Sequence, residues 1–268
     1  MRLIDHRYLG FSQFGEEGII RRIFDVLGTI EGHCCEFGAW DGIHLSNTRA
    51  LMLRGWHGLL IESQGERFSA LLETYRQNPR AVCLREQVDG AESSLPSIMR
   101  RYKLDRRLDF VSIDIDGLDH EVFASFADFP DPPRVVCVEA ATGHDPDDTR
   151  IMERAVAATG VGQPLRCFDD LAKKMNYRLI CYLATNAFFM HRDVGHEDDF
   201  PTLSPREGWL QNFELVRSSR FDREYLYLMN LGKRPPGFKY GNPLLSAQSL
   251  GIAPLRAMAL RIGFEPKQ

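Results

Sequence analysis

Short apolar runs alternate along the first 192 residues with segments whose apolar residues recur at helical spacing. The segment 11–28 has apolar residues at positions 19, 20, 23, 24 and 27 and a glycine at position 28, which is typical of a helix closed by glycine. The same helical spacing predicts further helices within 46–55, 66–78, 93–103 and 164–176. The short apolar runs predict strands within 32–42, 57–62, 81–84, 108–116 and 134–139. Regular alternation of strands and helices predicts an α/β fold with a parallel sheet.

The stretch 177–192 departs from that alternation. Two apolar strands follow each other there, separated only by a tight turn at Ala184, Thr185 and Asn186. So short a connection joins antiparallel neighbours, whereas parallel strands need a longer crossover. We therefore expect a sixth strand paired with an antiparallel seventh.

The pattern changes again after Asp193. Residues 193–206 are polar and interrupted by proline, and 207–268 contain short candidate helices among further prolines. This predicts a domain over 1–192 and a C-terminal appendage over 193–268. The appendage could cover an active site, select a substrate or build a homo-oligomer, and the sequence does not choose among these.

Acidic residues stand where the predicted strands end. Glu36 ends the first strand and is followed by Gly38 and Gly42, which allow a sharp turn close to a ligand. An acid at this position disfavours a phosphate and suits a cationic or hydroxyl-bearing ligand. Glu62 ends the second strand about 20 residues later, at the spacing where dinucleotide-type folds place the acid that bonds ribose hydroxyls.

The fourth and fifth predicted strands end in further acids. Asp114 and Asp116 share one face by the period-two rule, and Asp119 is a candidate N-cap of the next helix. Glu139 ends the fifth strand, and the polar loop 143–148 after it is the best candidate for substrate contact. Crowded carboxylates raise one another's pKa unless a cation or hydrogen bonds compensate, so this group suits a metal ion, a cationic ligand or general-base catalysis.

Composition narrows the classes of function. The net charge is −4, with 33 basic and 37 acidic residues, which indicates no nucleic-acid surface. There is no apolar signal region and no run of 18 apolar residues, so we expect a cytoplasmic protein without a membrane partner. Five of the six cysteines fall in apolar strand-like runs, and their spacing fits neither a zinc site nor a disulfide scaffold.

Several motifs resemble class I S-adenosylmethionine-dependent methyltransferases of the FkbM-like type. Glu36-x-Gly38-x-x-x-Gly42 resembles their motif I, with Trp40 in place of the middle glycine, and Ser12-Gln13-Phe14-Gly15-Glu16 resembles the entry before it. The stretch Ser112–Asp119 resembles their fourth-strand motif more specifically. The resemblance covers roughly residues 11–192 and implies a Rossmann-like seven-stranded sheet flanked by helices, with only the seventh strand antiparallel.

The resemblance also implies roles for particular residues. The cofactor would be S-adenosylmethionine, bound by Gln13, Glu36, Gly38, Asp41, Glu62, Val88 and Asp114. Asp116, Glu139 and His144 would act on the acceptor, most simply a hydroxyl of a sugar or related small molecule. Some sugar O-methyltransferases of this fold hold a divalent metal such as Mg²⁺ on acids of the fourth and fifth strands; here Ala140 replaces the second acid of the fifth strand, and the metal stays open.

Other classes of function remain open at this point. A dehydrogenase would also bind a nucleoside, but Gly-x-Gly-x-x-Gly is absent and the predicted terminal hairpin disfavours it. A catalytically silent protein of the methyltransferase fold, or an enzyme that methylates nitrogen in a small molecule or peptide, would carry the same motifs.

Overall fold

The computed structural model describes residues 2–8, 10–104, 106–141, 144–157 and 162–218. The chain divides into two compact units, Met1–Asn212 and Phe213–Gln268. Residues 193–212 therefore belong to the first unit, although the sequence pattern assigns them to the appendage. The role of the appendage stays a prediction, because most of it lies outside the described residues.

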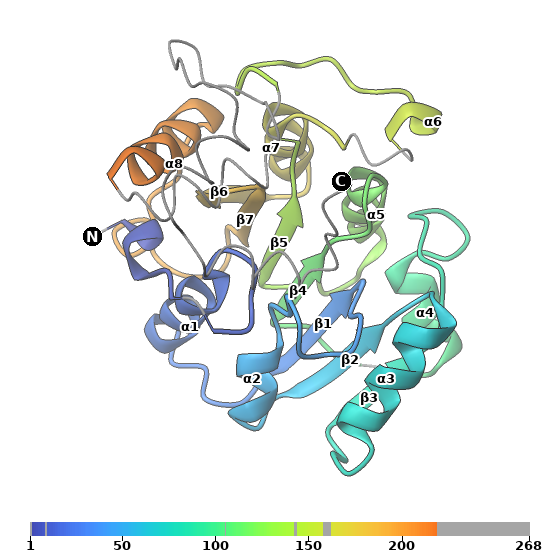
Figure 1. Cartoon of the computed structure of the whole chain (residues 1–268). Helices are drawn as coiled ribbons and strands as arrows, with labels where there is room; N and C mark the ends of the chain where they lie inside the picture. The colour runs from blue at the N-terminus through green and yellow to red at the C-terminus, as the bar shows by residue number, and fades with distance from the viewer. Residues whose placement is uncertain (1, 9, 105, 142–143, 158–161, 219–268) are drawn as a thin grey trace, which may run out of the picture. The chain divides into compact units, whose positions relative to one another are not determined.

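A seven-stranded sheet organises the first unit (Figure 1). Its strands are β1 (His33–Phe37), β2 (His57–Ile61), β3 (Ala81–Leu84), β4 (Phe110–Ile113), β5 (Val135–Glu139), β6 (Tyr177–Leu183) and β7 (Asn186–His191). The strand order is β3-β2-β1-β4-β5-β7-β6. Strands β1 to β5 pair in parallel, and β7 runs antiparallel to both β5 and β6. The predicted Rossmann-like sheet with an antiparallel seventh strand is confirmed.

Helices lie on both sides of this sheet (Figure 1). The longer ones are α1 (Glu16–Val26), α3 (Gly65–Tyr75), α7 (Leu165–Lys174) and α8 (Pro205–Ser218). The shorter ones are α2 (Arg49–Leu53), α4 (Leu95–Arg101), α5 (Asp119–Ala124) and α6 (Arg154–Val156), with 3₁₀ turns η1 (Leu3–His6) and η2 (Ser125–Asp128). None of the helices within the described ranges has the length and apolar character needed to cross a membrane.

The period-two alternation of the strands determines which helices they contact. Cys35 and Phe37 of β1 belong to one core cluster with residues of α4, α5 and α7. The alternate residue Cys34 faces the other side, where its thiol lies 3.9 Å from the sulfur of Met52 in α2. On the same side the Phe24 ring of α1 packs edge-on against Trp56, with centroids 4.7 Å apart. Both faces of the central strands β1, β4 and β5 are thus buried, which explains why their sequences are largely apolar, whereas the edge strand β3 is partly exposed.

Candidate functional site

The turn after β1 is built around the buried carboxylate of Glu36. One of its oxygens accepts hydrogen bonds of 2.7 Å from the hydroxyls of Ser46 and Thr48, and the other accepts the Asn47 backbone N–H at 2.6 Å. Burial raises the pKa of Glu36, and these hydrogen bonds oppose the rise. The predicted cofactor residue Glu36 therefore holds the segment 46–48 against the strand end. We infer that it positions the binding loop.

Gly38 follows β1 and lies close to the backbone that follows β4. Its φ is +64°, and a Cβ at this position would lie 2.3 Å from the carbonyl oxygen of Asp114. Only glycine fits without moving one of the two strands. The sequence predicts that this glycine allows a close approach to a ligand. In the described chain the close approach is to the Asp114 carbonyl, just beyond β4. It brings the β1 turn next to the β4 acids at the point where the strand order reverses, which is where open α/β sheets bind ligands.

Glu62 follows β2 and joins two backbone segments. Its Oε2 accepts the N–H of Trp40 at 3.0 Å, and its Oε1 accepts the N–H of Gln64 at 2.7 Å. Trp40 takes a left-handed backbone conformation, with φ of +48°, and its ring lies beneath the Arg67 guanidinium at 4.6 Å. The tryptophan that replaces the middle glycine of motif I thus has two specific contacts of its own.

The remaining residues predicted to bind the cofactor surround this turn. Asp41 accepts the N–H groups of Ile43 and His44 at 2.9 Å, so its carboxylate closes the turn from within. Val88 is 8% exposed and lies in the loop after β3. Gln13 is half-buried, in a loop whose Ser12 makes a parallel bridge to Leu45.

Three carboxylates converge beyond the ends of β4 and β5. One oxygen from each of Asp114, Asp116 and Glu139 lies within 4.8 Å of the other two. Asp114 and Asp116 are exposed and Glu139 is half-buried. The sequence placed these acids at neighbouring strand ends, and the fold brings them into one cluster.

The carboxylates of this cluster repel one another. Desolvation, followed by the negative charges of Glu139, Asp119 and Asp116, raises the pKa of Asp114 well above its ordinary range. Because the Asp114 side chain is exposed, water weakens the desolvation, and we attribute the raised pKa chiefly to repulsion by the neighbouring carboxylates. A cation placed among these groups would relieve the repulsion.

Asp119 is not the N-cap that the sequence predicts. It is the first residue of α5, and its carboxylate accepts the N–H groups of Ile115 at 2.9 Å and Gly117 at 2.8 Å, upstream of the helix. These bonds hold a turn in which Asp116 adopts φ of +56°. Burial raises the pKa of Asp119 to about 6. The residue therefore fixes the backbone that presents Asp116, a role that spacing alone does not reveal.

His144 takes part in a separate contact. Its Nδ1 lies 3.5 Å from Oδ2 of Asp148, four residues further along the same loop. The described contacts do not connect His144 with the three-carboxylate cluster, so its predicted action on the acceptor stays a prediction.

Sequence reasoning missed a buried pair at the edge of the cluster. Glu16, with no exposed surface, accepts the side-chain N–H of Asn186 at 2.6 Å and the Phe14 N–H at 2.8 Å. Asn186 is the register partner of Glu139 across β5 and β7. Burial raises the pKa of Glu16. The motif around Gln13 contained this acid, but only the fold shows that it contacts the strand beside Glu139.

Among the comparisons with known proteins, only the search of solved structures found similar chains. No family model and no curated protein matches the chain. Among solved structures, monomeric WbdD matches at 14% identity and a TM-score of 0.43 over 66% of this chain and 40% of that one. This chain therefore spans less than half of WbdD.

Two further structures are methyltransferases by name. A TehB-like S-adenosylmethionine-dependent methyltransferase from Corynebacterium glutamicum matches at 12% identity and a TM-score of 0.41, over 68% of this chain and 90% of its own. The other is NcsB1, an O-methyltransferase from neocarzinostatin biosynthesis in complex with S-adenosylmethionine and 2-hydroxy-5-methyl naphthoic acid. It matches at 17% identity and a TM-score of 0.40, over 60% of this chain and 49% of its own. Similarity at this level transfers neither an activity nor a substrate to this chain.

Proposed function

We propose that this protein is an S-adenosylmethionine-dependent methyltransferase that methylates a hydroxyl of a small molecule, such as a sugar or related metabolite. The observation that carries the proposal is the convergence of Asp114, Asp116 and Glu139 beside the point where the strand order reverses. The Ser112–Asp119 motif supports assignment to the FkbM-like type.

The cofactor half of the site rests on Glu62. An ionised carboxylate offers about four acceptor positions, of which the Trp40 and Gln64 N–H groups occupy two. The other positions suit the two hydroxyls of a ribose. Asp114, across the β1 turn, would then face the positively charged methionine end of the cofactor.

The reaction would be an in-line displacement in which the acceptor oxygen takes the methyl group from the sulfonium. Such a transfer depends on holding donor and acceptor in line and excluding water. The hydroxyl must also lose its proton as the bond forms. In this proposal Asp116 or Glu139 would accept that proton, and their proximity to each other and to Asp114 supports the assignment. The Glu16–Asn186 hydrogen bond steadies the strand next to Glu139.

A divalent metal fits the same carboxylates. Mg²⁺ prefers oxygen ligands, and Asp114, Asp116 and Glu139 supply three carboxylates close to one another, with solvent access for water ligands. Asp116, which follows β4, would take the place of the second acid that is absent at Ala140 after β5. A bound metal would lower the pKa of a coordinated hydroxyl.

The nature of the acceptor follows from charge and chemistry. Carboxylates accept hydrogen bonds from neighbouring hydroxyls, as in sugars. A nucleic-acid acceptor would need a basic groove beside the site, whereas the described site is acidic. Location in the cytoplasm and assembly into a homo-oligomer remain expectations from the sequence.

Calorimetry with S-adenosylhomocysteine tests the cofactor assignment, with NAD as the competing ligand. Glu62→Gln should weaken binding by about 1.5–3 kcal/mol, because one charge-assisted hydrogen bond is lost. Glu31→Gln is the matched control, because Glu31 is exposed and precedes β1, at the opposite end of the strands from Glu62. Equal affinity of the wild type and Glu62→Gln would remove Glu62 from the site, and binding of NAD alone would favour a dehydrogenase. Cofactor binding without a methylated product from a panel of sugars would indicate a silent binding protein or a different acceptor.

A further inference from the structure

A cavity lies near the amino ends of β4 and β5, at the opposite end of these strands from the carboxylate cluster. It has a volume of about 460 Å³ and is formed by the C-terminal end of α4 and the segments that precede β4 and β5. Met99, Leu104 and Phe129 supply apolar surface, and the last two pack against the main core. This volume is within the range of sites for small molecules.

Basic side chains dominate the polar part of this cavity. The charged residues that line it are Arg100, Lys103, Arg106, Arg107, Asp128 and Asp131. Arg107 is neutralised by Asp131, at 3.2 Å. For Arg100, Lys103 and Arg106 the described chain contains no ion pair with a carboxylate. The described residues that line this cavity thus carry four positive and two negative charges, an excess of two positive charges in a protein whose net charge is −4.

Lys103 adopts a left-handed backbone conformation, which residues other than glycine disfavour. Helix α4 ends in a Schellman turn, in which the Leu104 N–H bonds the Met99 carbonyl at 2.9 Å and the Lys103 N–H bonds the Arg100 carbonyl at 3.2 Å. Lys103 has φ of +55° at the position that glycine normally takes. The partial negative charge at the helix end accounts for some of the basic residues, but it does not require a lysine at the strained position.

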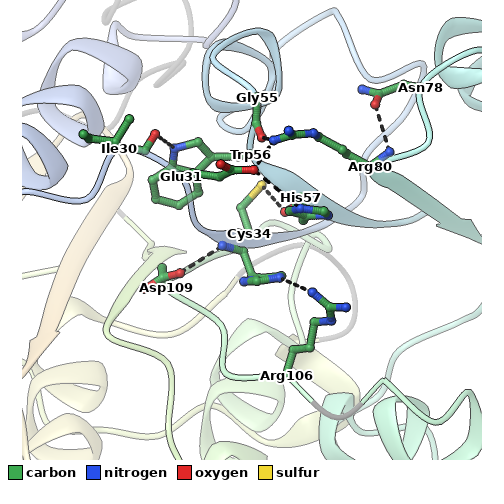
Figure 2. Close-up of polar contacts among 11 residues, drawn as sticks. Ile30, Glu31, Cys34, Gly55, Trp56, His57, Asn78, Arg80, Arg106 and Asp109 are labelled. Carbon is green, nitrogen blue, oxygen red and sulfur yellow. Dashed lines mark hydrogen bonds and ion pairs between the residues drawn. The ribbon is translucent and has the colours of Figure 1, made fainter.

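Arg106 is held in place from the other side. Its Nη1 lies 3.1 Å from Nε2 of His33, at the amino end of β1 (Figure 2). The His33 ring stacks on His57 with centroids 5.0 Å apart, and its backbone N–H bonds Asp109 at 2.9 Å. Desolvation lowers the pKa of His33, which favours the neutral ring that can accept a hydrogen bond from the guanidinium. Arg106 is therefore oriented without its charge being neutralised.

We propose that this cavity binds a small phosphate monoester whose organic group is apolar or aromatic. The phosphate would contact Arg100, Lys103 and Arg106, and the organic group would lie on Met99, Leu104 and Phe129. A phosphate monoester carries a charge of about −1.5 to −2 at neutral pH, which matches the excess positive charge of the cavity. Arginine forks match phosphate oxygens in pairs. The site goes beyond the proposed methyl transfer and does not depend on it.

Calorimetry of the full chain with phenyl phosphate tests the proposal. Inorganic phosphate and benzyl alcohol separate the contributions of the charge and of the ring. We expect phenyl phosphate to bind more tightly than either. Equal affinity for benzyl alcohol, or no heat from phenyl phosphate at millimolar concentration, would overturn the proposal. Tighter binding of a single-stranded oligonucleotide than of phenyl phosphate would also overturn it, in favour of a nucleic-acid surface.

Lys103→Gly provides a variant whose two effects run in opposite directions. It should weaken phenyl phosphate binding roughly tenfold or more, since a charge-assisted contact is lost, while raising the Tm because glycine relieves the strained turn. Arg22 is an exposed residue of α1 that lines a different cavity. The charge reversal Arg22→Glu should therefore leave phenyl phosphate binding unchanged. Undiminished binding by a stable Lys103→Gly variant, or equal loss in Arg22→Glu, would exclude this cavity as the site.

Discussion

Gly38→Ala tests how the two strands that frame the site are held together. The substitution adds a Cβ 2.3 Å from the carbonyl oxygen of Asp114, at a residue whose φ is +64°. Gly28→Ala is a matched control, because Gly28 has φ of +66° at the end of α1 and its added Cβ would have no neighbour within 4 Å. The two variants share the backbone strain and the change in the unfolded chain, and only one of them has the clash.

The expected magnitudes follow from these two contacts. A left-handed conformation costs a residue other than glycine about 1–2 kcal/mol, which both variants should lose. Gly38→Ala must also displace the backbone carbonyl of Asp114, just beyond β4, and overpacking of this kind costs about 1–3 kcal/mol more. We therefore expect a total loss of about 2–5 kcal/mol for Gly38→Ala, with Tm falling by about 2–4 °C per kcal/mol.

Urea denaturation of the three proteins measures the difference directly. Calorimetry with S-adenosylhomocysteine should show weaker binding by Gly38→Ala and unchanged binding by Gly28→Ala, because only the first displaces Asp114. If the two variants lost the same free energy of unfolding, the close approach of β1 to β4 would not be a constraint on the fold. That result would refute the positional argument for Gly38.

Three further outcomes can be measured. In single-turnover methyl transfer with saturating donor, Asp116→Asn or Glu139→Gln should be slowed by roughly 10²–10⁴ if that acid is the general base. If a metal does this work, EDTA should abolish activity and Mg²⁺ should restore it. Wild-type rates in both variants would move the acceptor site elsewhere. Burial raises the folded-state pKa of Glu16 and Glu36 above the ordinary 4.5, so their contribution to stability is complete below that value and is lost as the pH rises through the raised pKa. The Tm should therefore fall as the pH rises above the ordinary 4.5, and a double change to glutamine should flatten this slope. A Tm that rises with pH in this direction would contradict the assignment. All six cysteines are free in the structure, so thiol titration without reductant should find six thiols after denaturation and a slow reaction before it, and a deficit would indicate a disulfide.

The sequence by itself determined the strands, their acids and the final hairpin. The apolar strand runs are long enough to be buried on both faces, and the turn at Ala184 is too short for a parallel crossover, so topology followed from local pattern. Glu62, Asp114 and Glu139 became candidate site residues because the carboxyl ends of parallel strands share one edge of the sheet. These inferences rest on period and spacing, which are local properties.

The tertiary structure decided what each acid does. Glu36 satisfies the segment 46–48, Asp119 bonds backbone upstream of its helix, and Glu16 contacts Asn186 from 170 residues away. Hydrogen bonds of this kind depend on which segments the fold brings together, and sequence spacing does not encode that. Burial likewise sets the raised pKa of Glu16, because desolvation is a property of the surroundings in space. The basic cavity beneath α4 became visible for the same reason: its charges come from the end of one helix and the loop beyond it, and its apolar floor comes partly from a segment that precedes another strand.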